Sequence, residues 1–286
     1  TPLHLAAATG RSEAVRALLD GGADPRATTE TGEVTPLHFA AAAGDVEAIR
    51  ALLDAGAEVD ARETKWGQTP LVFAVSRERI DAVRALLGAG ADPEAATYVV
   101  QIPALQAESR EAARIRAQVL DSLAALEGVD AVVFRPTPAQ VELAVRRANA
   151  VEPAERIAPE DVPDSDPDVG DGGGSGYGSL VGAQGGLTPL LHAAREGHAE
   201  IVRILLDAGA DIDRASLGDH TTPILIAAIN GHYDLALELL DHGADPNIAS
   251  DAGTTPLYAV LNTWWAPKAR YPQQQAYLQQ EAGYLE

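Results

Sequence analysis

The 286-residue sequence contains no cysteine, no methionine and only three phenylalanines. Without cysteine, neither a disulfide nor a thiolate zinc site can form, and the redox compartment of the protein is left open. No run of about 18 apolar residues occurs, so no segment is predicted to span a bilayer. Alanine-rich segments with so few large aromatic residues fit thin structural repeats better than one large globular core.

Positive charge is also scarce, with 21 Lys and Arg residues against 42 Asp and Glu residues and a formal net charge of −21. The electrostatic field of such a chain repels nucleic acids and anionic membranes. We therefore expect neither of them as a partner. Protein surfaces that are basic or of mixed charge stay compatible with this composition.

The chain is organised around residues 35–61, a stretch that predicts two short helices. Thr35 can cap the first helix, and Pro36 stands at its first position, where the missing N–H costs nothing. Gly44 ends this helix, and Gly56 supplies the left-handed residue that closes the second one. Apolar residues of the second helix recur at helical spacing. Neither helix is long enough to be stable alone in water, so the unit needs neighbours.

The Thr-Pro pair that opens this unit recurs along the chain. It stands at Thr1, Thr35, Thr69, Thr188, Thr222 and Thr255. The spacings are 34, 34, 119, 34 and 33 residues, and a fixed period in this range is typical of a stacked repeat array. The end of the second helix recurs with it, for example as Leu205-Leu206-Asp207 followed by Gly209-Ala210-Asp211.

These features together resemble ankyrin-repeat proteins. The period, the Thr-Pro-Leu-His opener, the glycine between the helices and the Leu-Leu-x-x-Gly-Ala-Asp closer all match, in five full repeats and one partial repeat. The resemblance implies an all-α fold, an ankyrin-repeat solenoid of stacked helix pairs with connecting hairpins. It also implies a role in protein–protein recognition, although ankyrin repeats serve many unrelated partners.

We expect three segments along the chain. Residues 1–102 hold repeats one to three, residues 103–187 form a large insertion, and residues 188–286 hold repeats four to six, of which the last is incomplete. The second half of the insertion, from about residue 151, is acidic and then rich in Gly and Ser. Such a composition buries too little apolar surface to offset the entropy of ordering, so we expect a flexible loop there.

The first half of the insertion predicts two helices, from about Ala104 to Leu126 and from Pro138 to Asn149. The apolar, β-branched run at 129–134 predicts a short strand between them. The two helices either take the place of an ankyrin pair and keep the stack continuous, or they form a lobe beside the stack. Of these alternatives we favour the first.

No motif in the sequence predicts chemistry. The acidic run from Asp164 to Asp168 resembles the start of a calcium loop, but Val169 stands where that loop requires Gly, and Ser175 where it requires Glu. The glycine cluster fits no phosphate-binding register. The seven histidines are assigned structural roles, and by resemblance His4 and His38 brace the helix openers. We therefore expect no catalytic residue, no metal and no cofactor.

The resemblance places the partner-binding surface on residues just before each Thr-Pro opener and at the end of each first helix. Tryptophan and arginine are enriched in binding hot spots, which draws attention to Trp66 and Trp264. The alternative is that each tryptophan packs within its own repeat. The residues assigned to the surface are Lys65, Trp66, Gln68, Arg77, Arg195, Glu196, Asp219, Ile229, Asn230, Asn262 and Trp264.

The predicted function is thus a protein–protein interaction module that binds a protein partner through its concave face and hairpin tips, without catalysis of its own. The alternative is the recognition arm of a larger enzyme or effector whose catalytic domain lies outside this sequence. We also expect the sequence to be an excerpt of a longer protein, because it begins on a helix cap and stops inside an opening helix. A signal peptide would precede Thr1, so the compartment, cytoplasmic or exported, is left open.

Overall fold

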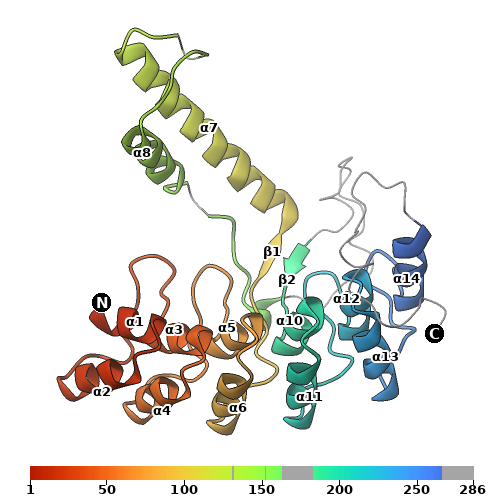
Figure 1. Ribbon diagram of the computed structural model, residues 1–286. Coiled ribbons are helices and arrows are strands. Elements are labelled where there is room, and N and C mark those ends of the chain that lie inside the picture. Colours follow the sequence, from red (N-terminus) through yellow and green to blue (C-terminus); the bar gives the residue numbers. More distant parts are fainter. Residues whose placement is uncertain (131, 152, 163–182, 266–286) are drawn as a thin grey trace. The chain divides into compact units, whose positions relative to one another are not determined.

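The computed structural model describes residues 1–130, 132–151, 153–162 and 183–265 (Figure 1). The first helices of the repeats are α1 (Pro2–Ala8), α3 (Pro36–Ala43), α5 (Pro70–Ser76), α10 (Pro189–Glu196), α12 (Pro223–Ile229) and α14 (Pro256–Trp265). The second helices are α2 (Ser12–Asp20), α4 (Val46–Asp54), α6 (Ile80–Gly88), α11 (Ala199–Asp207) and α13 (Tyr233–Asp241). The first helices lie side by side in one row and the second helices in another, as the all-α solenoid requires (Figure 1).

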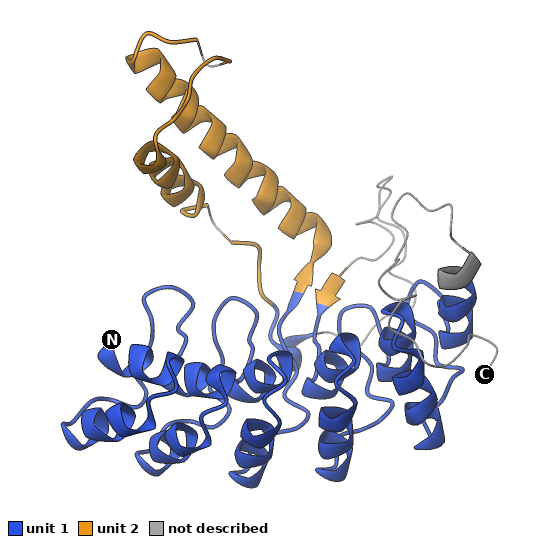
Figure 2. Ribbon diagram, in the orientation of Figure 1, with its two compact units in different colours: residues 1–99, 157–164, 185–286 blue, residues 100–156, 165–184 orange. Residues whose placement is uncertain are grey.

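The chain divides into two compact units (Figure 2). The repeat unit comprises residues 1–99, 157–164 and 185–286, and the lobe comprises residues 100–156 and 165–184. None of the described helices in either unit combines the length and the apolar character that crossing a membrane requires.

Each first helix begins as its Thr-Pro pair predicts. The side-chain hydroxyl of Thr188 accepts the amide N–H of Leu191, and that of Thr222 accepts the amide N–H of Leu225. Proline occupies the first helical position in both cases, where it has no N–H that would need a partner. The hydroxyls of Thr69 and Thr255 cap their helices in the same way, whereas that of Thr35 makes no cap bond to the backbone and lies 2.8 Å from His38 Nδ1.

The core of the repeat unit runs between the two rows of helices. Each second helix ends in a Leu-Leu pair. In repeats two to five the first leucine of the pair is fully buried, and the second is half-buried or exposed. The fully buried members are Leu52, Leu86, Leu205 and Leu239. Small residues such as Ala40 and Ala41, also fully buried, let adjacent first helices approach closely.

The insertion does not interrupt the stack. Helix α5 packs directly against α10, and α6 against α11, although about a hundred residues separate them in sequence. The interpretation of the two inserted helices as a substitute ankyrin pair is therefore wrong. The chain departs and returns at one hairpin, where the amide of Thr97 donates to the carbonyl of Leu187 at 3.1 Å and the amide of Gly186 to that of Tyr98 at 3.1 Å. Hairpins lie at the surface, so a long insertion there removes no core contact.

The lobe consists mainly of α7 (Ile102–Leu126) packed against α8 (Pro138–Ala148), which confirms both predicted helices. The strand predicted at 129–134 is wrong, because the amides of Val133 and Phe134 both donate to the carbonyl of Asp130 and so form a turn. Two three-residue strands, β1 (Val99–Gln101) and β2 (Ala183–Gly185), pair with each other, and a 3-10 turn, η1, spans Pro159–Asp161. The expected flexible loop falls largely on residues 163–182, outside the described residues.

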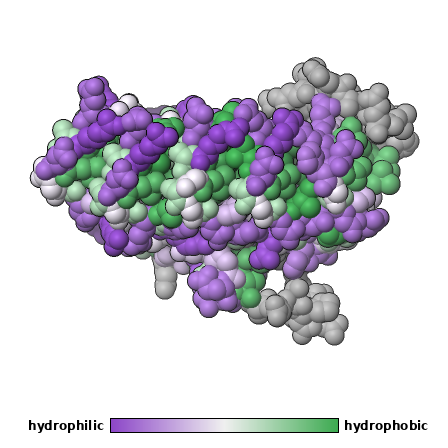
Figure 3. Space-filling model, turned by 90° about the horizontal axis from the view of Figure 1, so that it is seen from below, coloured by the Kyte–Doolittle hydropathy of each residue, from purple (hydrophilic) through white to green (hydrophobic). Residues whose placement is uncertain are grey.

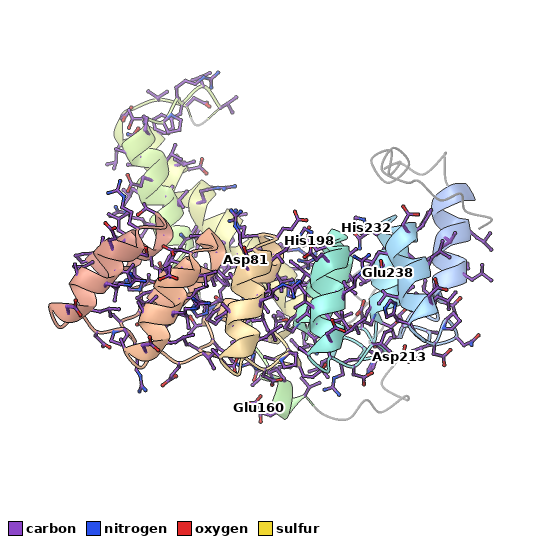
Figure 4. All side chains as sticks on the ribbon, turned by 60° about the horizontal axis from the view of Figure 1, so that its bottom comes forward. Asp81, Glu160, His198, Asp213, His232 and Glu238 are labelled. Atoms are coloured by element: carbon purple, nitrogen blue, oxygen red, sulfur yellow. The ribbon has the colours of Figure 1, made fainter. Side chains whose placement is uncertain are left out.

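Repeat three joins its two helices without the usual glycine. Gly44 and Gly197 hold this position in repeats two and four with φ of 80° and 78°, and Glu78 holds it in repeat three with φ of 55°. A residue with a Cβ is strained in this left-handed conformation. The Glu78 carboxylate lies 3.7 Å from Nδ1 of His198, the residue that precedes α11 (Figure 4).

Candidate functional site

The hairpin between repeats two and three, residues 62–69, is held by a buried carboxylate. Glu63 is only 4% exposed, and its side chain accepts the backbone N–H groups of Lys65 at 2.8 Å, Trp66 at 2.7 Å and Gln68 at 3.1 Å. Charge-assisted bonds of this kind are roughly twice as strong as neutral ones. The backbone of the hairpin tip is therefore fixed before any partner arrives.

The side chains of this tip point outward to different degrees. Lys65 is exposed and Trp66 is half-buried, with the Lys65 Nζ 5.9 Å from the centroid of the Trp66 ring. The carbonyl of Trp66 accepts the amide of Tyr98 at 2.8 Å. Gly67, with φ of 68°, has no room for a Cβ, which would lie 2.6 Å from the Tyr98 ring. The tip is thus braced from its own loop and from the neighbouring hairpin.

Glu63 was not predicted as a site residue, but a periodic signal points to it. In four hairpins, one residue uses its side chain to accept the N–H of the residue just before the next Thr-Pro opener. These pairs are Thr29 with Val34 (3.1 Å), Glu63 with Gln68 (3.1 Å), Thr97 with Leu187 (2.9 Å) and Ser216 with Thr221 (3.1 Å). The first three acceptors are spaced by 34 residues, so a search for hydrogen-bonding side chains at the repeat period would have found them.

Asp219, assigned to the surface from the sequence, braces its own hairpin. Its carboxylate accepts the hydroxyl of Ser216 at 2.5 Å and the hydroxyl of Thr221 at 2.9 Å. The carbonyl of Asp219 also accepts the amide of Asp251 in the next hairpin at 3.0 Å. Much of the hydrogen-bonding capacity of this carboxylate is therefore used within the fold, which lowers its value to a partner.

At the ends of the first helices the assigned residues differ in what they offer. Arg77 is exposed after α5, and Ile229 is 37% exposed at the end of α12. Arg195 Nε donates to the Glu196 carboxylate at 3.0 Å, so these two charges partly neutralise each other. The Asn230 side-chain amide donates to the carbonyl of Ile226 at 2.8 Å and ends α12.

The last two assigned residues, Asn262 and Trp264, belong to the final turns of α14. Their side chains fall outside the described part of the chain. The remaining assigned residue, Gln68, is half-buried, and its carbonyl accepts Nε2 of His38 at 3.0 Å. The backbone of Gln68 therefore helps to join repeat two to repeat three.

The Thr-Pro-Leu-His histidines brace the fold as the resemblance implied. His38 Nδ1 lies 2.8 Å from the Thr35 hydroxyl, while its Nε2 reaches across to the next repeat. His4 repeats this arrangement with Thr1 and Val34. Burial lowers the pKa of His38 to about 4, so the ring is neutral at physiological pH. His232, which precedes α13 and is labelled in Figure 4, donates its Nε2–H to the carbonyl of Arg195 at 3.0 Å.

His192 is the exception among the buried histidines. It occupies the position held by Phe39 and Phe73 in repeats two and three, and it is only 2% exposed. Its Nδ1 lies 3.1 Å from a guanidinium nitrogen of Arg195, but Nε2 has no hydrogen-bond partner within the described residues. Burial, and secondarily the charge of Arg195, lowers the pKa of His192 to about 3.

His192→Phe should raise the free energy of unfolding at neutral pH by about 1 kcal/mol, because it removes a buried unsatisfied polar atom. It should also reduce acid sensitivity. The pKa of His192 in the fold lies below its unfolded value near 6.5, so acid favours the unfolded chain. The stability that the wild type has with His192 neutral is fully present above pH 6.5 and is lost as pH falls toward 3. Between pH 7 and pH 5 this lowers the free energy of unfolding by about 2 kcal/mol. Denaturant melts at both pH values measure this, and equally steep losses in variant and wild type would contradict it.

Beyond these hydrogen bonds, the described residues contain no group of three or more His, Asp or Glu side chains arranged to hold a metal ion. On the face of the molecule seen in Figure 3, hydrophobic residues form a band bordered by hydrophilic ones.

A family model described as ankyrin repeats, in three copies, matches residues 3–97 and 168–260. The matched residues cover both groups of repeats and exclude most of the insertion. No curated protein matches the chain in sequence.

Proposed function

We propose that this chain, which belongs to the ankyrin-repeat family, binds another protein through its hairpin tips and the ends of its first helices. Ankyrin repeats are in general protein–protein interaction modules. The finer assignment of the surface to particular residues is our own.

The observation that carries the proposal is the hairpin at 62–69. Three of its backbone amides are held by one buried carboxylate, so presenting Lys65 and Trp66 costs little further ordering on binding. Trp66 offers a large flat apolar area, and Lys65 places a cation within 6 Å of it. A buried aromatic with a neighbouring cation is a common composition of a hot spot.

This chemistry also describes the partner. An apolar side chain would pack on the Trp66 ring, and a carboxylate close to it in the partner's sequence would pair with Lys65. Arg77, exposed at the end of α5, adds a second cation in the same repeat-three region of the sequence. The alternative function is a recognition arm of a larger enzyme or effector. It requires the same partner-binding surface, and its catalytic domain would lie outside this sequence.

Trp66→Ala should weaken partner binding at least tenfold, or by about 2 kcal/mol. Because the partner is unidentified, the probe is a set of peptides selected from a random display library for binding to the wild-type chain. Affinity is then measured by titration and stability by thermal melting. The melting temperature should change little, since the half-buried ring contributes little to the stack.

Leu240→Ala is the matched control, because this residue is 41% exposed on the second helix of repeat five, away from the hairpins. It should leave the affinity of the selected peptides unchanged. Peptides that bind Trp66→Ala as well as the wild type would show that binding occurs elsewhere. An unfolded Trp66→Ala chain would show that the ring belongs to the core.

A further inference from the structure

The lobe carries a disproportionate share of the exposed apolar surface. Thirteen large apolar residues are exposed among the described residues whose side chains are placed, and seven of them lie between Leu126 and Val145. The extreme cases are Leu126 and Val132, which are 84% and 86% exposed in and next to the turn that joins α7 to α8. Val133, at 61%, lies beside them. Exposed apolar side chains that gather in one region mark an interaction surface, whereas single scattered ones need no explanation.

Two helices cannot cover this surface by themselves. Although α7 has 25 residues, only Ile102 and Ala124 are buried on it, and on α8 only Ala144 and Ala148 are buried. A pair of antiparallel helices has no enclosed core. A four-helix bundle encloses an apolar core, and two copies of a helix pair can supply its four helices.

Charge favours a second copy of this chain as the occupant. Residues 100–156, which include α7 and α8, hold seven arginines and eight acidic residues, a net charge of −1. Residues 165–184 of the lobe add three aspartates, and the whole chain carries −21. Charge repulsion between two copies is therefore weakest at α7, α8 and the turn that joins them. Both signs also alternate along these helices, as in the ion pairs of Arg114 with Glu111 and of Arg146 with Glu142. In a two-fold contact the same surface of both copies meets. Because that surface carries both signs of charge, positive side chains of one copy can lie opposite negative side chains of the other.

We infer that the lobe is a self-association surface, which pairs with the lobe of a second copy of this chain through the apolar side chains of the α7–α8 turn. The contact is isologous, with the turn residues at its centre and the charged side chains of α7 and α8 around them. This function is separate from the partner binding proposed for the repeats, so either can fail while the other stands.

Sedimentation velocity on the full chain, from low micromolar to submillimolar concentration, tests the inference. The wild type should form a dimer, and Leu126→Glu combined with Val132→Glu should be monomeric over the same range. Both side chains are more than four-fifths exposed, so the double variant should keep the wild-type circular dichroism and melting temperature. Leu5→Glu is the control, because Leu5 is 68% exposed on α1 of the repeats, and it should dimerise like the wild type.

Salt provides a second arm of the test. Added salt screens the repulsion between the acidic repeats, so the dimer should tighten as ionic strength rises. A third arm uses the absence of native cysteine. Val129→Cys, at a residue 38% exposed in the same turn, should yield a disulfide-linked dimer on mild oxidation, while Ala8→Cys on the exposed side of α1 should not.

Several results would overturn the inference. A wild-type chain that stays monomeric over the whole range would show that something else, such as another segment of the chain, covers the lobe. A dimer that survives Leu126→Glu combined with Val132→Glu would place the interface elsewhere. A dimer that dissociates as salt is added would indicate an ionic contact instead of an apolar one.

Discussion

Replacing Leu205 by alanine should lower the free energy of unfolding by about 2–5 kcal/mol. Leu205 is fully buried on α11, about one helical turn after Ile201 and Val202, which are themselves buried. The substitution removes three carbon atoms from a core residue of α11, a helix that packs against α6 and α10, and a rigid stack relaxes only partly into the cavity. Urea melts of the two proteins under identical conditions measure the difference.

Leu240 is the control for this substitution. It is the second leucine of its pair and is 41% exposed, so Leu240→Ala should cost less than about 1 kcal/mol. Repeat arrays distribute stability over neighbouring interfaces, so the slope of the melt must be compared as well as its midpoint. A Leu205→Ala loss below about 0.5 kcal/mol would mean that the helix is rotated from its assigned orientation.

Glu63→Ala should be the most damaging substitution in the hairpins, with an expected cost of about 2–4 kcal/mol. One carboxylate satisfies the amides of Lys65, Trp66 and Gln68, and alanine leaves all three without that acceptor. Water can reach part of the tip, which keeps the cost below the sum of three buried hydrogen bonds. The tip should also lose its fixed conformation, so peptides selected on the wild type should bind more weakly.

Glu63→Gln is the matched control, because it keeps the shape and one acceptor oxygen but loses the charge. It should fall between the wild type and Glu63→Ala in melting temperature. Hydrogen exchange provides the local readout, since the amides of Lys65, Trp66 and Gln68 should lose protection in Glu63→Ala. Unchanged protection at these amides would show that the carboxylate does not hold the hairpin.

The two residues differ in how far the sequence predicted their roles. Leu205 belongs to an apolar stripe that is visible in the sequence, but the stripe did not say which leucine of the pair points inward. The first leucine is fully buried in repeats two to five because the packing of the first helices and of adjacent repeats selects that side. Glu63 gave no signal within its own hairpin, and only comparison across the repeats reveals its position.

The sequence by itself determined the repeats, their period and where their first helices begin. These depend on local rules, namely proline and threonine at helix starts, left-handed glycines at helix ends and apolar residues at helical spacing. A period of 34 residues then requires stacking, since no single helix pair is stable alone. Family membership follows from the same local features.

Only the tertiary structure decided where the insertion goes and what the polar hairpin residues do. Helices α5 and α10 meet because the apolar faces of repeats three and four match each other, whatever length of chain joins them. The carboxylates of Glu63 and Asp219 differ in role from those on exposed helices because each finds donors within its own hairpin. Whether a polar side chain braces the fold or faces a partner depends on neighbours brought together by folding, and a local pattern contains no record of them.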